Sequence, residues 1–471
     1  MKKKSLGTLL LAGALLVTST IPVMKVEASN SWPNSVACES RSAIVMVQET
    51  GTVLFEKNAD EKHYPASITK ILTALVALEH SKLDETVTYS ELAVSQSAGG
   101  TSSIWRDVDE QMTMEDSLYG MMLESANECA WAIGEHCGGG DIQVFLDMMN
   151  DKAKELGCKN SHFNNPNGLP DEDHWTSARD MALISRAAYA NPEFAKITGT
   201  RTYTIPPTNK HDDPTYLNNH HCMLNYYKTN QYLYDYCVGG KTGYTVAAGN
   251  TLVTYAHKDG MTLIVVILKS TKPQHWTDTI RLCDYFFDNY EVKSAAEVTD
   301  FSSTEPDSSF GKLADSDTAL IEVGKDDKIV LPKKAKKKKV EYTISPATED
   351  SPENAVGTVS YTYEDHDIGT ATIYASETSS RAYPFHNMDG EESADGSENQ
   401  NKNSSGFIQI NVPLVLGITV GFIALVVLFT IGIRKLFIYA REKHRDHKYT
   451  KPRKTHYREI HRDKGRRKRR R

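Results

Sequence analysis

Apolar residues between positions 29 and 292 follow two different repeats, which predict different elements. Four short runs rich in β-branched residues form two pairs around turn sequences: 43–47 with 52–56, and 250–256 with 261–268. Each pair predicts a β-hairpin. Residues 67–80 are instead almost wholly apolar after their start, which is typical of a helix buried on most sides. Strands at both ends of the region, with helices between them, permit one sheet built from both ends with a helical cluster against it.

Apolar and polar residues alternate in the next region, residues 293–385. The alternation is clearest in three runs: 340–344, 358–363 and 370–374. It predicts half-exposed antiparallel strands, so we expect a small all-β domain without catalytic residues. Four consecutive lysines at 336–339 interrupt it, and we interpret them as a solvated loop rather than a site for an anionic wall polymer.

Two longer apolar segments lie near the ends of the chain. Residues 1–28 have the order of basic, apolar and small residues found in a secretory signal peptide, with cleavage expected after Ala28. Residues 412–433 contain no charged side chain and, at about 1.5 Å per residue, are long enough to form a transmembrane helix. Residues 386–411 are acidic and nearly free of apolar groups, which predicts a disordered stalk.

The residues after the long apolar segment predict its orientation. Residues 434–471 carry 18 Lys and Arg against 4 Asp and Glu, so the rest of the chain is strongly acidic. By the positive-inside rule this basic tail is cytoplasmic and everything before residue 412 is extracytoplasmic. We therefore expect a single-pass protein of the cell membrane, held to lipid by the span and the tail. The acidic bulk argues against nucleic acid as a partner.

Seven cysteines fall in the region expected outside the membrane, and an odd number cannot pair completely within one chain. Cys129 and Cys137 are eight residues apart on one predicted helix, about 12 Å along its axis, which is too far for a disulfide. We expect mostly buried free thiols.

Ser67 and Lys70 are the first candidates for chemistry. Positions i and i+3 of a helix share a face, so the Lys70 amine can reach the Ser67 hydroxyl. A serine hydroxyl needs a base to become a good nucleophile, and burial among apolar neighbours lowers the pKa of a lysine until it can be that base. The N-terminus of the helix also offers free N–H groups for a developing oxyanion.

This S-x-x-K pair is followed by two further short motifs. Ser125-Ala126-Asn127 gives S-x-N, and Lys241-Thr242-Gly243 gives K-T-G immediately before the second predicted hairpin. Each motif alone is common, but the three in this order and at this spacing are the signature of penicillin-binding proteins and serine β-lactamases.

Within that superfamily the chain resembles the low-molecular-mass penicillin-binding proteins of the D-alanyl-D-alanine carboxypeptidase family (DacA type). The resemblance is strong over residues 29–290 and is carried by five segments: 65–70 (PASITK), 125–128 (SANE), 165–169 (NPNGL), 176–180 (TSARD) and 240–245 (GKTGYT). It implies an α/β (α+β) catalytic domain of the transpeptidase and β-lactamase type, followed by a small all-β domain and, in this chain, one transmembrane helix.

The resemblance also implies roles for four catalytic residues. Ser67 would be the acylated nucleophile and Lys70 its general base. Ser125 would relay protons towards the leaving amine, and Asn127 would hydrogen-bond either the substrate's peptide carbonyl or Lys70. No cofactor and no metal is implied, and His162 and His174 lack metal-ligand spacing.

Four further residues would bind substrate. Lys241 would hold the terminal carboxylate electrostatically, helped by the Thr242 hydroxyl. Gly243 would let the substrate backbone lie against the strand, and the N–H groups of Tyr244 and Ser67 would form the oxyanion hole. The implied partners are a peptidoglycan stem peptide ending in D-Ala-D-Ala, and β-lactams as acylating inhibitors.

Two alternatives stay open at this point. A β-lactamase needs rapid deacylation, but no E-x-x-x-N sequence lies between the second and third motifs, and a stalk, span and tail are unusual for that class. A receptor for β-lactams or wall fragments would signal through the tail without turnover. The sequence departs from the family in Ala126, where glycine is common, and in its apparent full span with a basic tail.

Overall fold

The computed structural model describes residues 36–299, 321–348 and 351–375 of the 471-residue chain. A five-stranded antiparallel sheet has the order β2-β1-β9-β8-β7. Its strands are β1 (Ser42–Val47), β2 (Val53–Lys57), β7 (Cys237–Thr245), β8 (Gly249–Lys258) and β9 (Met261–Ser270). Both predicted hairpins are confirmed, as is a sheet built from both ends of the region, with β7 at its edge.

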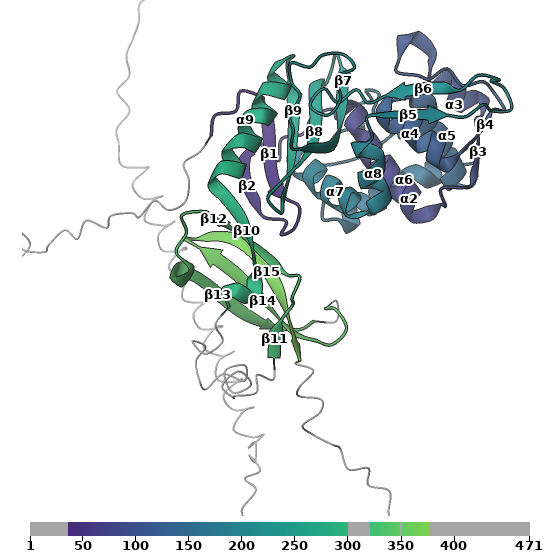
Figure 1. Ribbon diagram of the computed structural model, residues 1–471. Coiled ribbons are helices and arrows are strands. Elements are labelled where there is room, and N and C mark those ends of the chain that lie inside the picture. Colours follow the sequence, from purple (N-terminus) through teal and green to yellow (C-terminus); the bar gives the residue numbers. More distant parts are fainter. Residues whose placement is uncertain (1–35, 300–320, 349–350, 376–471) are drawn as a thin grey trace, which may run out of the picture. The chain divides into compact units, whose positions relative to one another are not determined.

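The two faces of this sheet are covered by different helices (Figure 1). Successive side chains of a strand point to opposite faces. Ala43, Val45 and Val47 accordingly lie in one hydrophobic cluster with residues of α9 (Gln274–Asn289). Ile44 and Met46 lie in a second, larger cluster with the helices of residues 70–199. The sheet is therefore the middle layer between α9 and a helical cluster.

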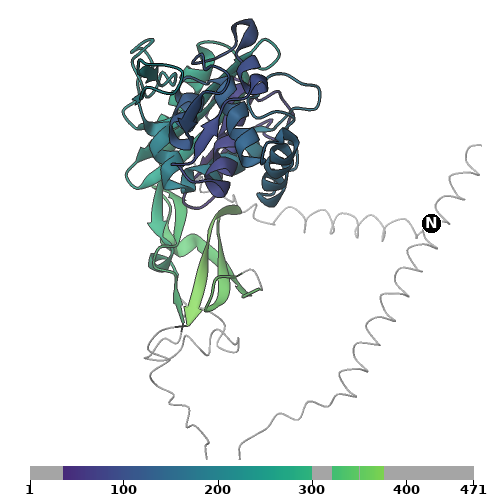
Figure 2. The same ribbon diagram turned by 90° about the vertical axis from the view of Figure 1, so that its right-hand side faces the viewer.

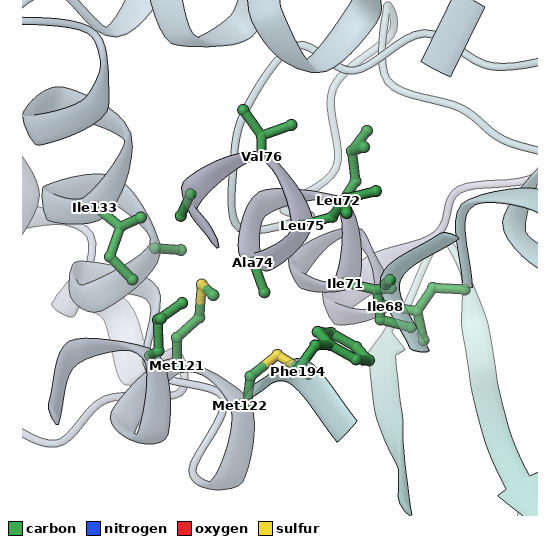
Figure 3. Close-up of a cluster of buried hydrophobic side chains, with 14 of the residues drawn as sticks. Ile68, Ile71, Leu72, Ala74, Leu75, Val76, Met121, Met122, Ile133 and Phe194 are labelled. Atoms are coloured by element: carbon green, nitrogen blue, oxygen red, sulfur yellow. The ribbon is translucent and has the colours of Figure 1, made fainter. Parts of the chain in front are cut away.

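Helix α2 (Lys70–His80) is the centre of the helical cluster. Its residues from Lys70 to Ala77 are all buried, which confirms the predicted apolar helix. Figure 3 shows apolar side chains of α4, α5 and α8 around it. The other helices are α3 (Glu91–Ser95), α4 (Met114–Leu123), α5 (Asn127–Cys137), α6 (Ile142–Glu155), α7 (Ala178–Ala190) and α8 (Pro192–Gly199). Two short hairpins complete this part: β3 (Thr86–Thr88) with β4 (Gln111–Thr113), and β5 (Thr202–Ile205) with β6 (Thr215–Asn218).

The strands predicted near residues 340, 358 and 370 are confirmed. They belong to a second antiparallel sheet of order β11-β15-β14-β13 (Figures 1 and 2). Its strands are β11 (Ile321–Val323), β13 (Val340–Pro346), β14 (Ala355–Tyr363) and β15 (His366–Ala375). The predicted boundary at residue 293 falls inside β10 (Tyr290–Ser294), because this strand continues from α9 and pairs with β12 (Lys328–Pro332). That residues 293–385 form a separate domain stays a prediction.

The predicted signal peptide (1–28), stalk (386–411), membrane span (412–433) and basic tail (434–471) lie outside the described residues. Within the described ranges, no helix combines the length and the apolar character needed to cross a membrane. All seven cysteines are described, and they are free thiols; Cys129, Cys237 and Cys283 are buried.

Candidate active site

Ser67 lies where the chain enters the helical cluster. A 3₁₀ turn over Ala66–Thr69 precedes α2, and Ala66 adopts a left-handed backbone with φ of 54°. In a 3₁₀ turn, side chains three residues apart are eclipsed, so Ser67 and Lys70 point the same way. Ile68 and Thr69 are buried, whereas Ser67 is half-buried and lines a cavity. The buried neighbours therefore fix the turn and leave the Ser67 hydroxyl accessible.

The Lys70 amine lies against three acceptors. Lys70 Nζ is 3.2 Å from Ser67 Oγ, 2.7 Å from Asn127 Oδ1 and 2.6 Å from the carbonyl oxygen of Asn167. A neutral amine has two N–H donors and one lone pair. The two short bonds can take both donors, which directs the lone pair towards the longer contact, at Ser67 Oγ.

The charge state of Lys70 fits this arrangement. Its side chain is fully buried, and burial lowers its pKa well below the ordinary 10.5. The positive charge of Lys241 lowers it further, while the Glu128 carboxylate acts in the opposite direction. Burial disfavours the charged form of an amine, so the site favours a neutral Lys70 that can accept a proton.

The loop Asn165–Leu169 supplies the third acceptor of Lys70. It is anchored on α2 because Thr73 Oγ1 donates to the carbonyl of Pro166 at 2.7 Å. Asn165 Oδ1 accepts from the N–H of Gly168 at 2.7 Å, which closes the loop on itself. The loop was noted in the sequence only as part of the resemblance. The loop contributes a backbone carbonyl oxygen. Every residue has one, so the residue type could not predict this contact.

We expect Gly168→Ala to disturb both stability and activity. Gly168 has φ of 86°, and a Cβ there would lie 1.9 Å from the carbonyl oxygen of Ala66. The loop would have to move, at a cost of about 1–3 kcal/mol for the strained backbone alone, and Asn167 would move with it. Thermal unfolding and acylation rates would both report the change.

Gly157→Ala is the matched control for this substitution. Gly157 has nearly the same φ, 81°, but a Cβ there would meet nothing within 4 Å. It should lose stability only through the left-handed backbone and keep full acylation. Equal losses in the two variants would contradict the role given to the Gly168 contact.

Ser125 and Asn127 sit on the other side of Lys70. Ser125 is only 5% exposed, has φ of 63° and lines the cavity. The N–H of Asn127 donates to the carbonyl of Ser102 at 2.9 Å, so the start of α5 is tied to a cavity-lining loop. Glu128 holds the same loop, because its Oε1 accepts from Ile104 N at 2.6 Å. Asn127 and the adjacent Glu128 thus hold the loop of residues 102–104 in place beside the cavity.

Strand β7 forms the remaining wall beside Ser67. A Cβ on Gly243 would lie 2.9 Å from the backbone nitrogen of Ser67, so only glycine allows the strand this close. Thr251 Oγ1 of the neighbouring strand donates to the Pro65 carbonyl at 2.8 Å and holds the two segments together. Thr242 and Tyr244 line the cavity, in line with the K-T-G prediction.

Lys241 is buried close enough to Lys70 for its charge to act on that amine. Its side chain is 2% exposed, it does not line the cavity, and its Nζ donates to the carbonyl of Thr242 at 3.1 Å. Burial lowers its pKa to about 7. Gly243, two residues further along β7, faces Ser67, so Lys241 lies on the same face of the strand. That Lys241 holds a substrate carboxylate directly stays a prediction.

The cavity has a volume of about 540 Å³ and contains a cationic region that the sequence did not reveal. Lys228, Lys272 and His220 line it together with Cys222. Both ammonium groups act electrostatically on Cys222. They follow no motif. The lining residues are Ser67, Gly100, Thr101, Ser102, Ser125, Asn127, Gly168, Leu169, His220, Cys222, Lys228, Thr242, Gly243, Tyr244, Thr245, Val246, Asn250, Lys272, His275 and Trp276.

His174 supports the site from behind. It is fully buried, its Nε2 is 2.9 Å from Thr69 Oγ1, and its Nδ1 accepts from the N–H of Asn164 at 3.0 Å. Burial lowers its pKa to about 3, so it is neutral near pH 7. His162 is bound instead to the carbonyl of Asp173. Across the described ranges, no group of three or more His, Cys, Asp or Glu could hold a metal ion.

Comparisons with known proteins agree with this site. Residues 26–272 match the model of peptidase family S11, D-alanyl-D-alanine carboxypeptidase. The chain is 33% identical to the D-alanyl-D-alanine carboxypeptidase DacF of Bacillus subtilis, over 62% of this chain and 72% of DacF. It is 32% identical to DacB2 of Mycobacterium tuberculosis, over 52% of this chain and 81% of DacB2.

The crystal structure of the Streptomyces K15 DD-transpeptidase is also similar, with a TM-score of 0.50 and 28% identity over 54% of this chain and all of that chain. The family match covers more than half of the chain and includes the three motifs that surround Ser67. The chain therefore belongs to the D-alanyl-D-alanine carboxypeptidase family and is a serine peptidase.

Proposed function

We propose that this chain removes the terminal D-alanine of peptidoglycan stem peptides through an acyl-enzyme on Ser67. The observation that carries the proposal is the buried Lys70 amine, which has short contacts to Asn127 and Asn167 and a longer one to Ser67 Oγ. This geometry leaves a lone pair for the serine proton. The direct test is release of D-alanine from a pentapeptide ending in D-Ala-D-Ala by the full chain in detergent.

Acylation begins with a proton transfer. Lys70 takes the proton of Ser67 Oγ while this oxygen attacks the carbonyl carbon between the two D-alanines. The N–H groups of Ser67 and Tyr244 hold the oxyanion, each such donor contributing about 10²–10³ in rate. The proton passes from Lys70 through Ser125 to the leaving nitrogen, the C–N bond breaks, and D-alanine departs.

Deacylation repeats these steps with water. Lys70 takes a proton from water as its oxygen attacks the ester carbonyl, and the ester C–O bond then breaks. The same proton returns to Ser67 Oγ, so the enzyme ends as it began. The shortened peptide is released as a carboxylic acid, which gives its remaining proton to solvent and leaves as a carboxylate.

The terminal carboxylate of the substrate is held by the cationic region of the cavity. Thr242 lines the wall next to Ser67, and Lys228 and Lys272 supply positive charge. Lys241 acts indirectly, because its charge lowers the pKa of Lys70. A direct contact of Lys241 with the same carboxylate stays a prediction.

β-Lactams present a similar carbonyl and carboxylate, so we expect them to acylate Ser67 and to leave slowly. No Asp or Glu is among the residues that line the cavity. A carboxylate that activates the deacylating water contributes about 10²–10⁴ in rate, and β-lactamases commonly use such a group. Mass spectrometry of the intact protein after a brief benzylpenicillin pulse measures the lifetime of the adduct. Hydrolysis within seconds would favour the β-lactamase alternative.

The sequence pattern supports a proposal for the location of the enzyme. We infer that residues 412–433 span the cell membrane once, with the catalytic part extracytoplasmic and residues 434–471 cytoplasmic. The uncharged apolar segment, the basic residues after it and the signal-like N-terminus support this orientation. External protease should remove the catalytic part from intact cells stripped of wall and leave the tail; protection of the catalytic part would reverse the assignment.

A further inference from the structure

A second cavity borders the Ser67 cleft. It has a volume of about 380 Å³ and shares no lining residue with the cleft. It is lined by Lys62, His63, Tyr64, Glu172, Trp175, Ala247 and Lys269. Three of its wall segments continue directly into the cleft: Tyr64 precedes Ser67 by three residues, Glu172 follows Leu169 by three, and Ala247 follows Val246. The two cavities are therefore neighbours along the surface.

The backbone of this second cavity is fixed. His63 N donates to the Thr176 carbonyl at 2.8 Å, and Thr176 N donates back to His63 at 2.9 Å. This pair locks the strand-like segment that carries Lys62 against the segment that carries Trp175. The His63 ring is anchored as well, with Nε2 2.8 Å from Ser42 Oγ. The walls are thus in place before a ligand arrives, which lowers the ordering cost of binding.

The charges around this cavity are only partly satisfied. Lys62 Nζ lies 4.9 Å from the centre of the Trp175 ring, and Lys269 Nζ donates to the carbonyl of Ala247 at 2.5 Å. An ammonium has three donors, so each lysine keeps donors for a ligand. In the parts of the chain that the structure describes, neither lysine forms an ion pair and neither does Glu172. His63 contributes no fixed charge near pH 7, since burial lowers its pKa.

Two unpaired cations and one unpaired carboxylate around an aromatic wall match a zwitterion. We propose that this second cavity is a subsite for a stem-peptide residue whose side chain ends in an α-amino-carboxylate group. The carboxylate binds the ammonium groups of Lys62 and Lys269, the amine binds Glu172, and the aliphatic part packs on Trp175. The subsite rests on the proposed function, because it takes the peptide upstream of D-Ala-D-Ala.

The direction of strand β7 supports this placement. Thr242 to Thr245 line the cleft in sequence, and the chain then turns through Val246 and Ala247 into the wall of the second cavity. A peptide that lies along β7 with its terminal carboxylate near Thr242 therefore extends towards the second cavity. Its upstream side chain needs only to pass the turn at residue 246.

The test is the affinity of full-length Ser67→Ala protein, which cannot turn over, for three peptides measured by calorimetry in detergent. The first is a pentapeptide ending in D-Ala-D-Ala whose third residue is diaminopimelate. The second is the same peptide with the side-chain carboxylate amidated, and the third is N-acetyl-D-Ala-D-Ala. We expect the first peptide to bind about 10–150-fold more tightly than the second, the range for one charged hydrogen-bonded contact.

Variants in the same background locate the effect. Lys62→Met and Lys269→Met should each remove most of that preference and leave the affinity for N-acetyl-D-Ala-D-Ala unchanged. Lys210→Met is the matched control, an exposed lysine that lines neither cavity. Equal affinity for the first two peptides, or equal loss for all three peptides in the lysine variants, would overturn the subsite. Because no turnover is needed, absent D-alanine release by the wild type would refute the proposed function without deciding this comparison.

Discussion

Ser67→Ala should lower the kcat/KM for D-alanine release by about 10⁴-fold or more, because the reaction then has no nucleophile. The rest of the cleft would remain, including the pair of N–H groups expected at the oxyanion and the cations at the carboxylate end. Substrate affinity should therefore change little. The loss should appear in kcat, measured as D-alanine release from a pentapeptide ending in D-Ala-D-Ala.

An adduct measurement and a control variant test the same prediction independently. The variant should form no covalent adduct with benzylpenicillin, which intact-protein mass spectrometry detects directly. Ser95→Ala is the matched control, because Ser95 is exposed on the short helix α3 and bonds only its near neighbours Leu92 and Gln96. Release of D-alanine by Ser67→Ala at the wild-type rate, or an adduct on another residue, would remove Ser67 from the centre of the mechanism.

The effects of Ser67 and Lys70 should not add. Both residues act in one proton transfer, so the loss of either abolishes the same step. A double variant should thus be about as slow as Ser67→Ala alone. An additional large loss in the double variant would indicate that Lys70 has a second task, such as binding the substrate.

Much of the fold was predictable from local patterns. The apolar runs of β1, β9 and α2 reflect which of their faces are buried. Buried positions are mostly apolar, so the sequence predicts them. The order of elements then allowed one sheet from both ends of the region. The predicted boundary at residue 293 falls within β10, whose partner β12 lies more than thirty residues away in sequence, so no local pattern marks this pairing.

The site was predictable only where side chains carry the chemistry. Ser67, Lys70 and Asn127 are close in space as the three motifs implied. The carbonyl of Asn167 was not foreseen, because a backbone acceptor has no residue signature. The burial of Lys241 was not foreseen either, because a motif names a residue without its exposure.

The second large effect concerns Lys70 as the base. Lys70→Arg keeps a positive charge but cannot accept a proton, because a guanidinium stays protonated in proteins. We expect acylation by substrate or β-lactam to fall about 10²–10⁴-fold at every pH, the usual contribution of a general base. Stopped-flow measurement of β-lactam acylation from pH 5 to 10 gives this rate directly. A variant that recovers at high pH would contradict the assignment, because no accessible pH supplies a neutral side chain at position 70.

The pH dependence of the wild type follows from the same charge. Only neutral Lys70 can take the serine proton, so acylation should rise as pH increases through the pKa of Lys70. Because burial and the Lys241 charge both lower this pKa well below 10.5, the rise should end far below that value. Lys241→Met removes the neighbouring charge, so the pKa of Lys70 should increase and the rising limb should move to higher pH.

A shift of this rise in the acylation rate along the pH axis distinguishes a lost electrostatic effect of Lys241 from structural damage by the substitution. Lys241 itself has a pKa of about 7, so its charge acts mainly below neutral pH, and the deficit of Lys241→Met should be greatest there and shrink as pH rises. Damage to β7 would instead lower acylation by the same factor at all pH values. Lys241→Arg, which keeps a cation at this position, should retain the wild-type limb. A uniform loss in Lys241→Met would leave burial alone to keep Lys70 neutral, and the K-T-G lysine would then have no part in preparing the base.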